Sequence, residues 1–204
     1  ASPREPRPVF HITAVTYRND PILTMSCMGV PVDDCQLQMA VTLTAVMWDE
    51  LVEQKQFPIT DIRVVAECCV FLTIISTKTP YTSIAHHIAT AFWGTKYGAH
   101  CPYLIVVNDD IDVMDMDQVM HAVTTKCHPV RGLQVMDNTP GQALFPFLSL
   151  EERLHGKGKH VLFDCTWPLD WDPAIAVPPR ASFDAIYPKD LREKVLNNWS
   201  NYGY

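Results

Sequence analysis

The feature that most limits the possible folds of this chain is a short, wholly apolar run at residues 103–107, followed directly by polar residues. A strand with one face in water alternates apolar and polar side chains, whereas a strand covered on both faces can be apolar throughout. We therefore expect residues 103–107 to form a central parallel strand that is buried on both faces.

The rest of the chain alternates between strand-like and helix-like stretches. Runs rich in β-branched and aromatic residues predict strands at residues 9–17, 62–67, 69–76, 133–136 and 160–165. Apolar residues at helical spacing predict helices at residues 37–52, 84–96, 117–127 and 189–199. This alternation predicts an α/β fold with three layers: a mixed sheet, helices on both of its faces and a further C-terminal helix.

Local signals mark some of the helix ends. Asp33 and Asp34 precede the first predicted helix and supply an aspartate N-cap. Gly98 is expected to act as the C-cap of the second helix. Pro188 is expected at the first position of the last helix, where its missing N–H costs nothing.

The composition excludes several classes of function. The formal net charge of -7 argues against sequence-independent nucleic-acid binding, which depends on Lys and Arg at the phosphates. The sequence contains no apolar stretch of about 18 residues, so we expect no membrane-spanning helix. Seven cysteines, an odd number with no CxxC pair, indicate reduced thiols and a cytoplasmic location.

A cluster of aspartates, Asp109, Asp110 and Asp112, directly follows the apolar run. Ligands of open α/β sheets gather at the carboxyl ends of strands, and clustered carboxylates suit Mg²⁺ or Mn²⁺. A metal-dependent glycosyltransferase built on Asp110 and Asp112 is therefore one candidate function. The alternative is that these aspartates cap the following turn and helix and face water.

Four segments resemble one family, the UbiD-type decarboxylases that depend on prenylated FMN. The segment that starts at Pro8 resembles the stretch after that family's catalytic region, and the aspartate cluster with the helix after it resembles a signature turn of the family. Two further segments are closest to the protocatechuate and ferulic acid decarboxylases. The segments read PVFHITAVTYRNDPIL, LIVVNDDIDVMDMDQVMHAVTTKCHPVRG, DNTPGQALFPFLS and YPKDLREKVLNNWSNYGY.

The resemblance implies that this chain is the C-terminal domain of such an enzyme. The proline-rich residues 1–8, which lack an initiator Met, are then a connector from a missing flavin-binding domain. Residues 9–204 form the α/β domain, with an irregular stretch at 166–188 and a terminal helix. The family's Glu–Arg–Glu network and flavin site match no residue here, so we expect no catalytic, cofactor-binding or metal-binding residue in this chain.

For the whole enzyme, the resemblance implies a reversible, non-oxidative decarboxylation of a hydroxybenzoate-type acid such as protocatechuate. Its cofactors are prenylated FMN, a divalent cation (Mn²⁺ or Mg²⁺) and potassium. The expected partners are its own flavin-binding domain, further copies in a dimer or larger oligomer, and the aromatic acid, but neither nucleic acid nor membrane. The chain alone is expected to be inactive, and the aspartate turn is structural in the family, which weakens the metal hypothesis.

The resemblance also places four residues on the wall of the substrate pocket: Cys35, Met39, Gln142 and Leu144. Ferulic acid decarboxylases have an apolar Phe-Pro-Leu where this chain has Gln142, Ala143 and Leu144. A polar Gln suits a hydroxylated benzoic acid, whose phenol groups need hydrogen-bond partners once they leave water. The alternatives are that Gln142 only caps a turn, or that the domain is an oligomerisation module that never contacts substrate.

Overall fold

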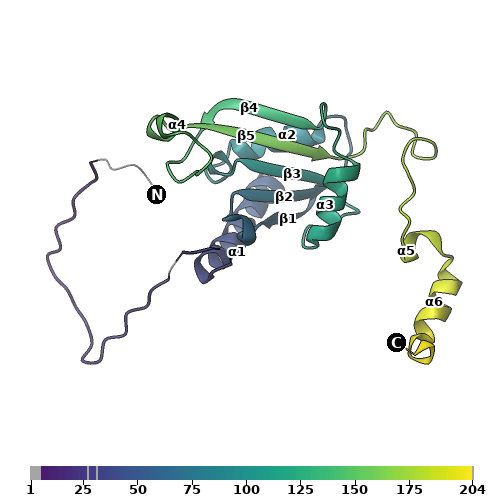
Figure 1. Ribbon diagram of the computed structural model, residues 1–204, viewed down its shortest axis with the longest axis horizontal. Helices are drawn as coiled ribbons and strands as arrows, with labels where there is room; N and C mark the ends of the chain where they lie inside the picture. The colour runs from purple at the N-terminus through teal and green to yellow at the C-terminus, as the bar shows by residue number, and fades with distance from the viewer. Residues whose placement is uncertain (1–5, 27, 31, 204) are drawn as a thin grey trace. The chain divides into compact units, whose positions relative to one another are not determined.

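The computed structural model describes residues 6–26, 28–30 and 32–203, and it divides into two compact units, Ala1–Thr166 and Trp167–Tyr204 (Figure 1). The first unit contains a five-stranded sheet with helices, which confirms the predicted α/β fold. None of the described helices is both long and apolar enough to cross a membrane.

The sheet is mixed, with the strand order β1-β2-β3-β5-β4. Its three inner strands, β2, β3 and β5, are parallel, and β1 and β4 pair antiparallel at the two edges. The apolar run forms β3 in the centre of the sheet, as the sequence predicts. The strands are β1 (Ile59–Val64), β2 (Leu72–Thr77), β3 (Tyr103–Asn108), β4 (Leu133–Pro140) and β5 (Lys157–Cys165).

Helices cover both faces of the sheet, so the three-layer prediction is also confirmed (Figure 1). The helices of one face are α1 (Asp34–Trp48), its π-helical continuation (Asp49–Gln54) and α2 (Ile84–Trp93), and α3 (Met116–Thr125) covers the other. Leu104 and Val106 of β3 belong to the core cluster under α1 and α2, whereas Ile105 and Val107 belong to the cluster under α3. Successive side chains of a strand point to opposite faces, which is why a strand between two helical layers is apolar at every position.

The first helix begins directly after the N-cap that the sequence predicts. The carboxylate of Asp33 accepts a hydrogen bond from the backbone N–H of Gln36 at 2.8 Å, which satisfies one of the free donors in the first turn. The hydrogen bonds from Gly29 and Gln36 hold the pKa of Asp33 below its ordinary value. The predicted N-cap is therefore confirmed as Asp33, with Asp34 in the first turn.

The end of the second helix differs from the prediction. Helix α2 ends at Trp93 and its C-cap is Gly94, so the predicted extension to residue 96 and the predicted cap at Gly98 are wrong. Gly98 instead begins a short 3-10 helix, Gly98–His100. A Cβ atom on Gly98 would lie 1.8 Å from the carbonyl oxygen of Phe92, so this glycine is required by a close backbone approach.

The predicted strand at residues 9–17 is also wrong in this structure. These residues adopt no helix or strand, and their large apolar side chains are exposed, Phe10 at 88% for example. A strand is stable only when neighbouring strands take up its backbone hydrogen bonds. None of the strand pairings described for the sheet involves this segment, so it forms no strand despite its β-rich composition.

The second unit contains the short helix α5 (Phe183–Ile186), the terminal helix α6 (Lys189–Asn197) and a 3-10 turn (Trp199–Tyr202). Pro188 is the N-cap of α6, one position before the place that the sequence predicted. No residue between 167 and 203 is buried. This unit therefore has no hydrophobic core of its own.

Candidate functional site

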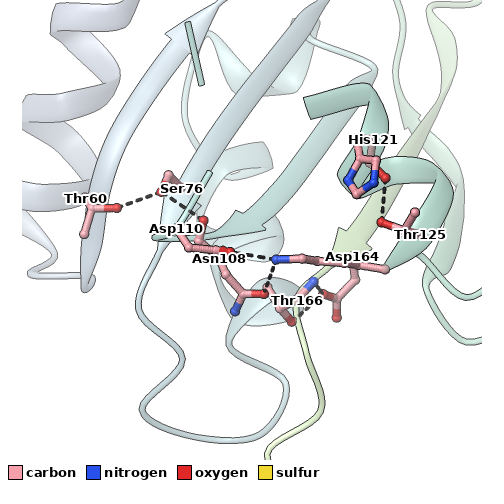
Figure 2. A network of polar contacts seen from close by, with 9 residues as sticks. Thr60, Ser76, Asn108, Asp110, His121, Thr125, Asp164 and Thr166 are labelled. Atoms are coloured by element: carbon pink, nitrogen blue, oxygen red, sulfur yellow. Dashed lines mark hydrogen bonds and ion pairs between the residues drawn. The ribbon is translucent and has the colours of Figure 1, made fainter. Parts of the chain in front are cut away.

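The carboxyl ends of the parallel strands carry a network of polar side chains (Figure 2). Lys126, at the end of α3, has a side chain that is only 8% exposed, and its ammonium group lies 3.0 Å from a carboxylate oxygen of Asp110. The same nitrogen donates to the side-chain oxygen of Asn108 at 3.4 Å. Asp110 therefore pairs with the buried positive charge of Lys126, which is a structural role.

The other aspartates of this edge act mainly as caps. Asp112 accepts a hydrogen bond from the backbone N–H of Met114 at 2.8 Å. Asp115 caps α3 by accepting from the backbone of Asp117 and Gln118, and hydrogen bonds from Gln118 and Asp117 lower its pKa. Within the described residues no group of three or more His, Cys, Asp or Glu side chains is placed to hold a metal ion. Asp112 thus acts as a cap, as the capping interpretation expects, whereas Asp110 pairs with Lys126.

The network continues to the end of β5. Asp164 accepts hydrogen bonds from the backbone N–H and the hydroxyl of Thr166, at 3.0 and 2.6 Å (Figure 2). The second oxygen of Asp164 lies 3.7 Å from His86 Nδ1. Ser76 of β2 donates to the backbone carbonyl of Asn108 at 3.4 Å. These polar groups bind one another, so the edge at which α/β sheets commonly bind ligands is occupied here by internal contacts.

The amino ends of β2 and β3 border a cavity of about 750 Å³, which lies within the size range of small-molecule sites. One wall is helix α1, and the others are the segments that precede β2 and β3 and the loop that follows β4. The side chains on these walls are mainly apolar. The apolar ones include Met39, Leu43 and Val46 of α1, Val70 and Phe71 before β2, and Leu144 and Pro146 after β4.

Three of the four residues predicted for the pocket wall line this one cavity. Met39 comes from α1, whereas Gln142 and Leu144 come from the loop after β4, so the fold brings together residues from opposite halves of the chain. The fourth, Cys35, is not among the described lining residues. It lies one turn before Met39, with its sulfur 3.9 Å from the sulfur of Met39.

The turn at Gln142 does not need the side chain of this residue. The backbone carbonyl of Gln142 accepts the hydrogen bond that closes the turn, from the backbone N–H of Phe145 at 3.1 Å. None of the described hydrogen bonds involves the Gln142 side chain, and the residue lines the cavity.

Sequence reasoning missed the polar residues that line the remainder of the cavity, namely Gln36, Glu50, Lys96, Tyr97 and His100. The hydroxyl of Tyr97 donates to the backbone carbonyl of Val70 at 2.8 Å, and burial raises the pKa of Tyr97, so it stays neutral. Neighbouring Cys101 is fully buried, which raises its pKa to about 11 and keeps it a thiol. No pattern in the sequence marks these residues, because they meet only after folding.

The fold and the cavity together define a three-layer α/β domain with a ligand-sized space at the amino ends of its parallel strands. The family model for the 3-octaprenyl-4-hydroxybenzoate carboxy-lyase C-terminal domain, UbiD_C, matches residues 37–165. The chain therefore belongs to the UbiD family and contains its C-terminal domain.

Individual relatives agree with this assignment. A pyrrole-2-carboxylic acid decarboxylase from Pseudomonas aeruginosa is 26% identical over 208 residues, which cover 98% of this chain and 42% of that protein. The closed form of vanillic acid decarboxylase from Sedimentibacter hydroxybenzoicus has a TM-score of 0.69 and 24% identity, over 86% of this chain and 35% of the other.

The UbiD-class enzyme HmfF from Pelotomaculum thermopropionicum shares the fold as well. Its structure with FMN has a TM-score of 0.62 and 18% identity, over 81% of this chain and 34% of that chain. An evolved dimeric form of HmfF, solved with prFMN, has a TM-score of 0.50 and 17% identity, over 67% and 27% of the two chains. This chain thus spans less than half the length of each of these relatives.

Proposed function

We propose that this chain is the C-terminal domain of a non-oxidative aromatic acid decarboxylase and forms part of the wall of its substrate pocket. The observation that carries the proposal is the convergence of Met39, Gln142 and Leu144 on one cavity of about 750 Å³, in a chain that belongs to the UbiD family. The apolar side chains exclude water from an aromatic ring, and the amide of Gln142 orients it.

A hydroxybenzoate-type acid such as protocatechuate is the proposed substrate class. A phenol that enters an apolar pocket loses its hydrogen bonds to water and needs a replacement. The Gln142 amide donates through its NH₂ group and accepts through its oxygen, so it binds a phenol hydroxyl in either sense. The reaction is proposed to be reversible, as in the family that the sequence resembles.

A second candidate class is a five-membered heteroaromatic acid. It is favoured by the similarity to the pyrrole-2-carboxylic acid decarboxylase over almost the whole chain. A pyrrole N–H is a hydrogen-bond donor, and the Gln142 side-chain oxygen accepts from it as it does from a phenol.

Within the described residues, no cluster of three or more His, Cys, Asp or Glu side chains is placed to hold the divalent cation of a flavin phosphate site. We therefore assign prenylated FMN, which supplies the electrophile in this family, with its divalent cation and potassium, to the flavin-binding part of a longer protein. The FMN and prFMN complexes of HmfF support a flavin cofactor for the longer enzyme.

The same longer protein is proposed to supply the remaining walls of the pocket. Two observations support this proposal: the curated relative is more than twice as long as the region it shares with this chain, and the apolar side chains of residues 9–17 have no described partner strand. The longer protein, loaded with prenylated FMN, is expected to release CO₂ from protocatechuate. The isolated chain is expected to be inactive and to bind no flavin. Stoichiometric flavin absorbance of the isolated chain would contradict the assignment of the flavin to another part of the longer protein.

Substitution of Gln142 by Phe in the longer enzyme tests the role of the cavity directly. The variant loses the partner of the phenol hydroxyl, and an unpaired buried hydroxyl costs about 1–3 kcal/mol. We expect kcat/KM for dihydroxybenzoates to fall roughly ten- to a hundredfold, while any trace activity on cinnamic acids is kept or increases. The measurement is kcat/KM for both acid classes at equal flavin occupancy.

Gln38→Phe is the matched control, because Gln38 is exposed on α1 and does not line the cavity in the described structure. An equal fall for both acid classes in Gln142→Phe would assign Gln142 to folding or domain closure. No change for either class would place Gln142 outside the pocket and favour an oligomerisation module that never contacts substrate.

A further inference from the structure

The loop after β4 passes the ends of two other strands before its residues reach the cavity. The strand order β1-β2-β3-β5-β4 places β5 and β3 between β4 and β2, and the amino end of β2 borders the cavity. The ring centroid of Phe145 lies 5.0 Å from that of Phe71, directly before β2, so the loop reaches this end of the sheet. The place of Gln142 and Leu144 on the cavity wall therefore depends on the path of the loop.

The loop begins where two glycines lie against each other, Gly141 directly after β4 and Gly158 in β5. A Cβ atom on Gly141 would lie 2.6 Å from the carbonyl carbon and oxygen of Lys157, and one on Gly158 would lie 2.4 Å from the carbonyl oxygen of Pro140. An ordinary non-bonded contact is about 3.5 Å, so neither position has room for a side chain. Neither glycine has a positive φ, so the close approach of the two backbones, and not their conformation, requires glycine.

The other end of this short segment is fixed in the core. Phe145 is fully buried, and its ring stacks on Phe147 with the centroids 5.3 Å apart. The backbone N–H of Phe145 donates to the carbonyl of Gln142 at 3.1 Å, which closes the turn. Only residues 142–144 separate Gly141 from Phe145. A shift of the backbone at either end is therefore passed to the wall residues between them.

We propose that Gly141 and Phe145 are positioning residues. They hold the side chain of Gln142 at the cavity wall, where it binds the ring hydroxyl of the acid. The inference rests on the proposed function and deepens it, because it identifies what sets the place of that binding group. A methyl group on Gly141 would have to move the loop about 1 Å away from β5 to reach an ordinary contact distance. A misplacement of about 1 Å costs up to roughly a hundredfold in rate where the geometry is critical.

Gly141→Ala in the longer enzyme tests the proposal. The variant displaces the amide of Gln142, so we expect kcat/KM for dihydroxybenzoates to fall roughly ten- to a hundredfold, mostly through a higher KM. The fall should be much smaller for an acid without ring hydroxyls. A purely structural glycine would instead lower the amount of folded enzyme, and with it the apparent kcat for both acids, while KM stays unchanged.

Gly132→Ala is the matched control. Gly132 directly precedes β4, and a Cβ atom there would also meet backbone, at 2.7 Å from the nitrogen of His128. Gly132 is not among the residues that line the cavity. The control should therefore melt at a lower temperature but keep the wild-type ratio of the two kcat/KM values.

Phe145→Leu takes the place of Gly141→Ala if the latter does not fold. The smaller side chain loosens the other end of the segment without a clash, so the selectivity should change in the same direction. Leu162→Val is its control, because Leu162 is also fully buried but lies in β5 and does not line the cavity.

Hydrogen exchange, measured by mass spectrometry, gives a readout that needs no turnover. The peptide that contains residues 142–148 should exchange roughly tenfold faster in Gly141→Ala than in the wild type, because the turn closed by the Phe145 N–H opens more often. The peptide of β3 in the same sample reports unfolding of the whole domain and serves as the reference. In Gly132→Ala the loop peptide should gain no more than the β3 peptide does.

The outcomes separate this inference from the proposed function. A wild type that decarboxylates hydroxybenzoates, with equal losses for both acid classes in the folded variant, overturns the positioning role alone. A wild type that is inert on every aromatic acid overturns the proposed function, and hydrogen exchange then decides the positioning role. Faster exchange of the loop peptide in the variant than in its control supports it, whereas equal exchange overturns it.

Discussion

At the scale of single residues, we expect His160 to link the stability of the domain to pH. Its ring on β5 stacks on Trp93, with the ring centroids 5.0 Å apart and the planes at 24°. Its Nε2 lies 3.2 Å from the carbonyl oxygen of Ala99, which only accepts, so Nε2 carries the proton. Nδ1 is buried with no partner among the described residues. Burial lowers the pKa of His160, and nearby His100 adds to this shift.

The sign of the pH effect follows from that shift. The unfolded chain titrates His160 near its ordinary value of about 6.5, so below that pH the unfolded state binds more protons than the folded state. The free energy of unfolding should therefore decrease as the pH falls from about 7 to about 5, with a slope from this residue of at most about 1.4 kcal/mol per pH unit. Urea unfolding of the chain across this range measures the slope.

His160→Phe keeps the ring on Trp93 and removes the titrating group. We expect the variant to lose about 1 kcal/mol at neutral pH, for the hydrogen bond to Ala99, and to show a flatter pH profile. His121→Phe, which changes an exposed histidine on α3, should retain the wild-type profile. Equal slopes in wild type and His160→Phe would show that His160 does not control the pH dependence.

At the scale of secondary-structure elements, the turn between α2 and β3 depends on the absence of a side chain at Gly98. The backbone N–H of Gly98 donates to the hydroxyl of Thr95 at 2.9 Å, which holds the chain against the end of α2. A Cβ atom there would meet backbone atoms of Phe92 at 1.8 and 2.5 Å. Backbone atoms of a helix end cannot move aside as a flexible side chain can, so the turn must distort.

Gly98→Ala should therefore destabilise the domain by about 3 kcal/mol or more, because the strain adds to lost packing around β3. Gly29→Ala is the matched control, since a Cβ atom on Gly29 meets nothing within 4 Å. The control should change the free energy of unfolding by no more than about 0.5 kcal/mol. Similar urea midpoints for Gly98→Ala and Gly29→Ala would contradict this account of the turn.

At the scale of the whole molecule, the second unit has apolar side chains with no core in which to bury them. Leu196 is 60% exposed, Trp199 53% and Tyr202 49%. Tyr204, the third aromatic residue of the tail, lies outside the described residues. Exposed apolar clusters on soluble proteins mark interfaces, and aromatic residues anchor them.

We therefore expect the chain to self-associate, with a dimer as the simplest case, and the tail to contribute to the contact. Deletion of residues 198–204 should lower the mass measured by light scattering at high protein concentration. It should leave the melting temperature of the first unit almost unchanged, because none of the described residues 198–203 is buried. A wild type that stays monomeric, with a mass per chain that the deletion does not alter beyond the lost residues, would exclude this interface.

The sequence by itself determined the features that depend on neighbouring residues. The central strand, the alternation of strands and helices and the Asp33 cap are all confirmed, because strand burial patterns and caps involve side chains within a few positions of one another. The resemblance to the UbiD family, carried by contiguous motifs, also led to Met39, Gln142 and Leu144, and these do share a cavity.

Only the tertiary structure decided the features that depend on distant partners. Residues 9–17 have strand-like composition but no described neighbour, and Leu37 and Val41 of α1, apolar at helical spacing, are 51% and 72% exposed. The aspartates that follow β3 predicted a site at the carboxyl ends of the strands. The cavity lies instead at the amino ends of β2 and β3. Burial of the Gln36 side-chain oxygen without a hydrogen-bond partner among the described residues is likewise decided by the packed fold, because it depends on which groups folding brings near.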